Sequence, residues 1–372
     1  MKKLLIKAIG ITNPLWRGYN SGVGRSTFLL LDALAKIKNL PFEIEVYTNG
    51  ISSIGYKFNN WPFKHFSFPI PENFGCHKTS LESMFRKNFL HNDLFHIPHN
   101  YDKTFKDEKY VVTLHDVIGY DTALKEQNTY EINKWLNIAK NASGIVTCSN
   151  YSKNEIVNKL NVDPDKISVI YWGISLEKFH KESINITKKK LEEIGINFPY
   201  FVSVSCAHPR KNVRTLLKAY REFAKSNPKH KLVLVWGNPP TDILNEYNKE
   251  ISEKKIIFLR YVSDEILLSL YNGASLTLFP TLSEGFGFPI LESFACGTPI
   301  MTCRNTSLPE VGGDVALYVG EKNIDEMVDV MNMFENNTYN YDNFLRESQI
   351  HIKRFSWENT AKEYVKFYTK YL

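Results

Sequence analysis

The chain has 372 residues, of which 43% are hydrophobic and 23% are charged, and its formal net charge is +6. This length predicts two domains of about 180 residues each, and the composition is that of a soluble globular protein. No apolar run approaches the roughly 20 residues that a membrane-spanning helix needs, and the small net charge argues against nucleic acid as a partner.

The N-terminus and the cysteines favour a protein of the cytoplasm. Lys7 interrupts the apolar run that follows Lys2 and Lys3, so this run is too short for a secretory signal. The cysteines are scattered and include no CxxC pair: Cys76, Cys148, Cys206, Cys296 and Cys303. We therefore expect a reducing compartment, no disulfide framework and no structural zinc site.

The chain opens with the pattern of a Rossmann-like unit. An apolar run predicts a buried strand over residues 4–9, and apolar residues at helical spacing predict a helix over about 25–37. The loop between them contains Gly22-Val23-Gly24 and is placed to approach a phosphate. Thr27 stands where a dinucleotide fingerprint has its third glycine, and no acidic residue follows the next strand, 44–47. These departures argue against a nicotinamide cofactor.

Residues 53–100 are irregular and rich in aromatic side chains, with lysines and arginines among them. Loops and a hairpin that pack their own aromatic residues would explain this pattern. A surface that contacts a lipid headgroup or an acceptor would explain it as well. The excess of positive charge in residues 1–180 fits such a surface, but solvated lysines on exposed faces account for it equally.

A candidate substrate contact follows the predicted strand at residues 110–114. His115 and Asp116 stand at the carboxyl end of this strand, which is where ligands bind in open parallel sheets. A lone histidine is usually structural. A histidine beside an aspartate at a strand end is a better candidate for hydrogen bonding to a substrate.

The first half ends with two further strands, at residues 144–148 and 167–170. Ser149 is the expected N-cap of a helix that starts near residue 153. Residues 175–199 are polar and rich in lysine, which predicts a linker region with one helix near 187–194.

The second half begins a new series of strands at residues 200–205. Arg210 and Lys211 lie at the mouth of the next strand–loop–helix turn, where two cations suit a diphosphate. Further strands are predicted at 232–236, 256–259, 274–279 and 300–303, and helices at 213–223, 265–271 and 356–372. Strands that alternate with helices in both halves predict an α/β fold of two doubly wound domains.

The segment after residue 279 combines backbone and carboxylate groups. Pro280 ends the predicted strand, a loop with two glycines follows, and Pro289 stands where a helix can begin. Glu284 falls in the loop, and Glu292 is expected in the first turn of the helix. Free backbone N–H groups and acidic side chains together predict a cradle for an anionic or hydroxyl-rich ligand.

Six motifs spread over nearly the whole chain carry one family pattern: Gly22-Val23-Gly24-Arg25, Thr113-Leu114-His115-Asp116, Arg210-Lys211-Asn212, Glu284 and Glu292 with seven residues between them, Ala295-Cys296-Gly297-Thr298-Pro299, and Leu308-Pro309-Glu310-Val311-Gly312-Gly313. With them the chain resembles family 4 of the retaining glycosyltransferases (glycosyltransferase group 1). These enzymes have the GT-B architecture, in which two Rossmann-like domains face one another across a cleft.

The resemblance implies a division of the chain. Residues 1–175 would form a Rossmann-like acceptor domain, and residues 176–199 would be the linker region. Residues 200–355 would form the nucleotide-sugar domain, and the helix at 356–372 would cross back to the first domain. Two positions depart from the family pattern: Trp172-Gly173 replaces the usual Asn-Gly, and Ser205 replaces a frequent glycine.

The resemblance also implies roles for residues of the second domain. Glu292 would bind the ribose hydroxyls, and Arg210 and Lys211 would bind the diphosphate. Backbone groups from Arg260 to Val262 would contact the base. Donor-sugar hydroxyls would be held by a set from the glycine loop: Glu284, Gly285, Phe286 and Gly287.

From the first domain, the family pattern brings Gly22 and Gly24 close to the diphosphate. It places His115 opposite the donor sugar, near the reacting carbon, with Asp116 beside it as a further binding residue. His115, Glu284, Arg210 and Lys211 are therefore the expected catalytic residues.

The expected reaction needs no cofactor and no metal. The donor would be a UDP- or GDP-sugar, and two cations can stabilise the nucleoside diphosphate that leaves. The sequence shows no DxD-like carboxylate pair in a suitable loop. Glu284 could act as a nucleophile in a double displacement. The family pattern favours a front-face, retaining transfer in which Glu284 binds and orients the sugar.

Other activities remain open from the sequence. A nucleotide-sugar epimerase, or a nucleotide-sugar binding protein without transfer, could use the same scaffold. As a transferase, the chain most resembles members that extend bacterial surface polysaccharides, so a glycan or polyprenyl-linked acceptor is expected. The expected location is the cytoplasm, and peripheral contact with the inner face of the membrane is left open.

Overall fold

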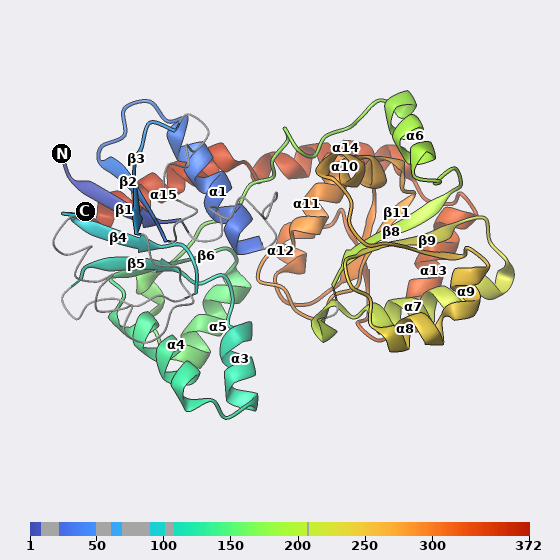
Figure 1. Cartoon of the computed structure of the whole chain (residues 1–372), viewed down its shortest axis with the longest axis horizontal. Coiled ribbons are helices and arrows are strands. Elements are labelled where there is room, and N and C mark those ends of the chain that lie inside the picture. The colour runs from blue at the N-terminus through green and yellow to red at the C-terminus, as the bar shows by residue number, and fades with distance from the viewer. Residues whose placement is uncertain (9–21, 50–60, 69–89, 101–107, 207) are drawn as a thin grey trace. The chain divides into compact units, whose positions relative to one another are not determined.

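The computed structural model describes residues 1–8, 22–49, 61–68, 90–100, 108–206 and 208–372 (Figure 1). These residues form two units, the first from residues 1–173 and 356–372, the second from residues 174–355. In this part of the chain, no helix is long and apolar enough to cross a membrane.

The first unit is built on a parallel sheet of seven strands in the order β3-β2-β1-β4-β5-β6-β7. The strands are β1 (Lys3–Lys7), β2 (Glu43–Asn49), β3 (Lys64–Phe68), β4 (Leu94–Ile97), β5 (Tyr110–Thr113), β6 (Gly144–Thr147) and β7 (Ile167–Val169). Of the two explanations left open for residues 53–100, loops and a hairpin are wrong for the part that the structure describes. There β3 pairs in parallel with β2, and β4 pairs in parallel with β1 and β5.

Helices cover both faces of this first sheet. They are α1 (Gly22–Ala35), α3 (Ile118–Lys125), α4 (Thr129–Asn141), α5 (Asn150–Leu160) and α15 (Trp357–Tyr371), with a 3-10 turn η2 (Pro164–Lys166). Figure 1 shows α1 and α15 on one side of the sheet and α3, α4 and α5 on the other. Between the sheet and α4 lies a buried core that includes Phe95, Val112, Trp135 and Ile145.

The last helix belongs to the first unit although it follows the second in the sequence. The Tyr368 hydroxyl is hydrogen-bonded to Nδ1 of His96 in β4 (2.8 Å), and Thr360 Oγ1 donates to the carbonyl of Tyr171 (2.8 Å). Gly173 keeps the glycine of the usual Asn-Gly pair, and a Cβ there would lie 2.1 Å from the backbone nitrogen of Trp357. The close approach of α15 requires a glycine.

The second unit has a parallel sheet in the order β10-β9-β8-β11-β12-β13, which is the Rossmann order 3-2-1-4-5-6. The strands are β8 (Tyr200–Ser205), β9 (Lys231–Trp236), β10 (Ile256–Leu259), β11 (Leu276–Phe279), β12 (Ile300–Cys303) and β13 (Leu317–Val319). The prediction of an α/β fold with two doubly wound sheets is confirmed. The short edge strand β13 was not expected from the sequence.

The helices of the second unit also form two layers. They are α6 (Ile184–Glu193), α7 (Val213–Phe223), α8 (Thr241–Glu246), α9 (Asn248–Ser252), α10 (Asp264–Gly273), α11 (Phe288–Ala295), α12 (Leu308–Gly312), α13 (Ile324–Glu335) and α14 (Tyr341–His351), with 3-10 turns η3 (Pro209–Lys211), η4 (Ala224–Ser226) and η5 (Ile352–Arg354). In Figure 1, α7 and α13 lie on one face of the sheet, and α10, α11 and α14 lie on the other.

Residues 176–199, expected as a linker, are part of this second unit. Helix α6 packs on α10, and the Glu182 carboxylate links the two helices. It accepts hydrogen bonds from Lys190 (2.6 Å), Thr187 (2.8 Å) and Ser269 (2.8 Å). The lysine-rich segment is therefore folded against α10, and the chain passes between the units at residues 173–174 and 355–356.

Candidate functional site

The loops that follow β8 and β11 meet in the second unit, at the point where its strand order reverses. The Leu282 amide and the Thr281 hydroxyl both donate to the carbonyl of Arg210, at 2.7 and 3.0 Å. Strand order places these loops together because β8 and β11 are neighbours that point the same way. Ligands of open α/β sheets bind at this position, beyond the carboxyl ends of the two strands.

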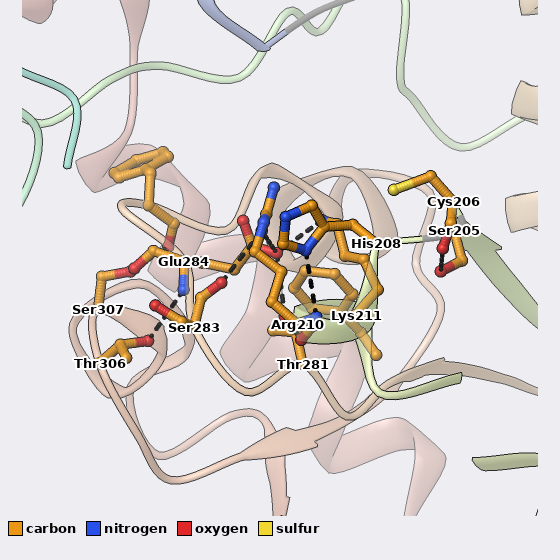
Figure 2. A network of polar contacts seen from close by, with 12 residues as sticks. Ser205, Cys206, His208, Arg210, Lys211, Thr281, Ser283, Glu284, Thr306 and Ser307 are labelled. Atoms are coloured by element: carbon orange, nitrogen blue, oxygen red, sulfur yellow. Dashed lines mark hydrogen bonds and ion pairs between the residues drawn. The ribbon is translucent and has the colours of Figure 1, made fainter. Parts of the chain in front are cut away.

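Two cations converge there on a single carboxylate oxygen (Figure 2). Oε1 of Glu284 lies 2.7 Å from Arg210 Nη1 and 2.6 Å from Lys211 Nζ, and it also accepts from Thr281 Oγ1 (3.1 Å). The side chains are partly exposed, at 28% for Arg210, 17% for Lys211 and 13% for Glu284. The structure thus brings together three of the four residues expected to be catalytic.

The cations are held in place by the turn that carries them. Nδ1 of His208 accepts from the Arg210 amide (3.3 Å) and caps η3. Asn212 then adopts a left-handed backbone (φ 57°), and its side-chain amide donates to the carbonyls of Pro280 (2.9 Å) and Glu321 (2.7 Å). Asn212 ties the loop after β8 to the loop after β11. Asn212 is part of the motif Arg210-Lys211-Asn212, but the sequence pattern predicted no role for it. Asparagine tolerates this left-handed conformation better than most residues.

The glycine loop around Glu284 is fixed by a turn of two hydroxyl residues. Ser307 Oγ donates to the carbonyls of Glu284 and Phe286, both at 2.9 Å, and the Glu284 amide donates to Thr306 Oγ1 (3.3 Å). Figure 2 shows Glu284 between this turn and the Arg210–Lys211 loop. The motif that starts at Leu308 directly follows this turn, but the sequence pattern did not predict that the turn supports the loop.

Gly287 gives the loop its exit into α11. Its φ of 111° is open to glycine and strained for other residues, and a Cβ there would lie 3.0 Å from Leu308 Cδ2. Gly285 precedes Phe286, whose ring is buried and contacts Phe288 (5.4 Å between centroids). The ring therefore anchors the loop in the core, which leaves backbone groups as what Phe286 can offer a ligand.

Glu292 lies deeper than expected. Helix α11 begins at Phe288, so Glu292 belongs to the second turn and the expectation of a first-turn position is wrong. Its side chain is buried and accepts a hydrogen bond from the Tyr271 hydroxyl of α10 (2.9 Å). The cluster of Arg210, Lys211 and Glu284 is built without it.

Arg260, Tyr261 and Val262 form the connection from β10 to α10, as expected from their place after a strand. The Tyr261 side chain is 79% exposed, and a Cβ at Gly237, the residue after β9, would lie 3.3 Å from its ring. Arg260 also lines a cavity of about 480 Å³ along the edge strand β10, together with Pro239. The loops after β9 and β10 are thus neighbours at the carboxyl end of the sheet.

His115 belongs to the first unit and follows β5. It is buried, its ring packs on Trp172 (4.9 Å between centroids), and its Nε2 donates to the carbonyl of Pro98 (3.0 Å). Burial lowers its pKa to about 4, so the ring is neutral at pH 7. With the proton on Nε2, Nδ1 is a buried acceptor that has no hydrogen-bond partner among the described residues.

Three other candidate residues of the first unit are also placed. Asp116 Oδ1 accepts from the amide of Ile118 (2.9 Å) at the start of α3, so this carboxylate has a structural task. Gly22 and Gly24 lie in the first turn of α1, which corrects the expectation of a loop up to residue 24. Residues 9–21, which include the rest of the expected loop, lie outside the described residues.

Two family models match the chain, one in each of the two units. The model of Glycosyltransferase Family 4 matches residues 20–178, and the model of Glycosyl transferases group 1 matches residues 186–350. Two doubly wound domains with a cationic loop at the switch point define a protein of the GT-B class. The two matches cover most of the chain, and the chain belongs to this family of glycosyltransferases.

Similar proteins include enzymes of bacterial O-antigen synthesis. O-antigen chain mannosyltransferase B of Escherichia coli is 27% identical over 295 residues, which are 76% of this chain and 74% of that protein. O-antigen chain mannosyltransferase RfbU of Salmonella typhimurium is 30% identical over 217 residues, which are 55% of this chain and 57% of that protein.

Among solved structures, Alr3699/HepE of Anabaena in complex with UDP and glucose superposes with a TM-score of 0.75. The superposition covers 100% of both chains at 16% sequence identity. At this identity the likeness establishes the shared GT-B fold alone.

Proposed function

We propose that the chain is a retaining, metal-independent glycosyltransferase that moves mannose from a nucleotide-diphosphate sugar to a glycan or lipid-linked acceptor in surface polysaccharide synthesis. The observation that carries the proposal is the convergence of Arg210 and Lys211 on one anionic oxygen at the switch point of the second sheet. A site that already holds a carboxylate between two cations is suited to a diphosphate. Mannose is supported by the names of the two O-antigen relatives.

The cations would supply the main catalytic effect. When the bond between the anomeric carbon and the phosphate breaks, the leaving nucleoside diphosphate gains negative charge. Arg210 and Lys211 would stabilise that charge in the partly buried loop, where electrostatic interactions are stronger than in water. Their two positive charges would do the work that a divalent cation does in other transferases.

Glu284 would bind and orient the donor sugar. Its Oε1 is held by two cations and a hydroxyl, which makes this carboxylate a poor nucleophile. This environment supports a front-face transfer, in which the leaving phosphate stabilises the positive charge of the sugar ring on the same face. The anomeric configuration of the donor would then be retained in the product without a covalent intermediate on Glu284.

The remaining roles follow the family pattern. We propose Glu292, held by Tyr271, for the ribose hydroxyls and the loop from Arg260 to Val262 for the base. Backbone N–H groups of Phe286 and Gly287 would assist Glu284. In the first unit, His115 would act through its unpaired Nδ1, with Asp116 and the glycines of α1 as further binding residues.

The test is a panel of UDP- and GDP-linked hexoses, including mannose, assayed with polyprenyl-linked glycans in EDTA. We expect mannose transfer, undiminished by EDTA, and NMR of the product should show the anomeric configuration of the donor. Interconversion of free nucleotide sugars without transfer would instead identify an epimerase. Activity lost in EDTA and restored by a divalent cation would refute the metal-free mechanism, and inverted product would refute retention.

A further inference from the structure

The carboxylate of Glu284 pairs with the two cations that would bind an anionic ligand (Figure 2). Both cations of the loop after β8 pair with the same atom, Oε1. Among the described residues, Glu284 is the one acidic side chain that forms an ion pair with Arg210 or Lys211. The positive charge of Arg210 and Lys211 is therefore partly neutralised by a carboxylate of the same unit.

From this geometry we infer that Glu284 makes the site selective for a sugar-linked diphosphate over the free nucleoside diphosphate. The inference rests on the proposed function, because it assumes that Arg210 and Lys211 bind the diphosphate of the donor. It goes beyond that function because it gives Glu284 a task in rejecting the product as well as in holding the sugar.

The selectivity follows from the repulsion between the Glu284 carboxylate and a bound diphosphate. A diphosphate that engages the cations must displace the Glu284 carboxylate or lie within a few ångströms of it, and either arrangement is unfavourable for two anions. A donor offsets this cost because its sugar hydroxyls can donate to the displaced carboxylate. A free nucleoside diphosphate has no such hydroxyls and carries more negative charge on its terminal phosphate.

The second oxygen of Glu284 prepares it for that exchange. Oε2 makes no hydrogen bond to the residues that the structure describes, whereas Oε1 has three partners. Oε2 can thus accept hydrogen bonds from hydroxyls of the donor sugar while Oε1 is still paired. Both oxygens can accept once the two cations pair with the diphosphate instead. After transfer the sugar is gone, and Glu284 can again pair with the two cations, which favours release of the nucleoside diphosphate.

The experiment compares nucleotide affinity in Glu284→Gln and in the wild type. Titration calorimetry with UDP and with GDP should show that the variant binds the nucleoside diphosphate about tenfold more tightly, equivalent to about 1.4 kcal/mol. Turnover should fall in the same variant, because the amide cannot accept sugar hydroxyls as a carboxylate does, and inhibition by the added nucleoside diphosphate should become stronger.

Glu321→Gln is the matched control. It removes one negative charge from a nearby loop, where Glu321 accepts from Asn305 Nδ2 (2.6 Å) and pairs with neither cation. Its affinity for UDP and GDP should stay within about twofold of the wild type, as expected for a screened charge. An equal gain in both variants would overturn the inference, because general electrostatics would then explain it.

Lys211→Ala separates failure of this inference from failure of the proposed function. If the wild type binds UDP or GDP, if Lys211→Ala weakens that binding, and if a folded Glu284→Gln binds no more tightly, the inference alone is wrong. If neither nucleotide binds the wild type, or if Lys211→Ala binds as well as the wild type, the diphosphate site itself is wrong. Circular dichroism and the unfolding temperature establish that each variant is folded.

Discussion

In the first unit the strand order reverses between β1 and β4, and in the second unit it reverses between β8 and β11. Around the ends of β4 and β5 the first unit has buried histidines and hydroxyl groups, and the carboxylate of Asp116 accepts from the amide of Ile118. Nε2 of His96 bonds Thr113 Oγ1 (2.9 Å), and His115 is buried and uncharged. The second unit places two cations and a carboxylate at the equivalent edge.

The difference teaches that the same topology can carry either a charged or an uncharged set of side chains at its switch point. Paired cations suit phosphate oxygens, whereas buried neutral imidazole and hydroxyl groups suit ligands that carry hydroxyls. Under the proposed function, the charged residues that bind the diphosphate and the hydroxyls of the donor lie in the second unit, whereas the first unit contributes the uncharged His115. Substitutions at the charged loop should therefore change nucleotide binding, and changes of pH should act mainly on the neutral network.

The largest expected effect is that of Arg210→Ala. Under the proposed function, loss of this guanidinium removes one of the two positive charges that stabilise the leaving diphosphate, so kcat/KM should fall by about 10²-fold. Arg214→Ala is the control, because Arg214 lies one turn further on and pairs with Asp242 at an exposed position. Steady-state kinetics with the active donor measure both. Equal losses in the two variants, or none in either, would mean that Arg210 has no specific role in the charged loop of the second unit.

The next effect concerns acid. Burial lowers the pKa of His115 to about 4, and burial together with the charges of His99 and His115 lowers that of His96 to about 3. A histidine of the unfolded chain titrates near its ordinary value of 6.5, so between pH 6.5 and 4 the unfolded state takes up protons that the folded unit does not. The free energy of unfolding of the first unit should therefore have its full value above pH 6.5 and fall by a few kcal/mol towards pH 4.

Urea unfolding at pH 7, 6, 5 and 4 measures this dependence. In His96→Asn the pH slope should be shallower, because one of the two titrating groups is gone, and His115→Asn provides a second variant of the same kind. Identical slopes in the wild type and in both variants would mean that the folded unit binds these protons. His96 and His115 would then not stay uncharged in the folded first unit at acid pH.

Sequence patterns anticipated the second unit better than the first, for a physical reason. Its strands are apolar runs bounded by glycine, proline or charged residues, and β8 was predicted at its observed bounds. Strand β4 contains His96, which is buried because it bonds Thr113 and Tyr368, 17 and 272 positions away in the chain. Local patterns cannot show partners at such distances, and the strand was missed.

The candidate site divides in the same way. Parallel topology places the ends of β8 and β11 together, so a common location for Arg210, Lys211 and Glu284 could be expected. Their pairing through one carboxylate oxygen could not, because it depends on side chains 73 residues apart. The inward position of Glu292 was also out of reach, since it depends on where α11 begins and on a bond from Tyr271.

The smallest effect tests how the charged loop is held. Asn212→Ala loses two hydrogen bonds between the loops and puts a Cβ-bearing residue without a polar side chain at φ 57°. The unfolding free energy of the second unit should fall by about 2 kcal/mol. Asn212→Gly loses the same bonds without backbone strain, so urea unfolding should place it about 1 kcal/mol above the alanine variant. In both variants nucleotide affinity should fall, since Lys211 is no longer fixed beside Glu284. If either Asn212 variant binds the nucleotide as tightly as the wild type, the hydrogen bonds of Asn212 do not position the cations. The strands of the sheet would then be sufficient to position Arg210 and Lys211.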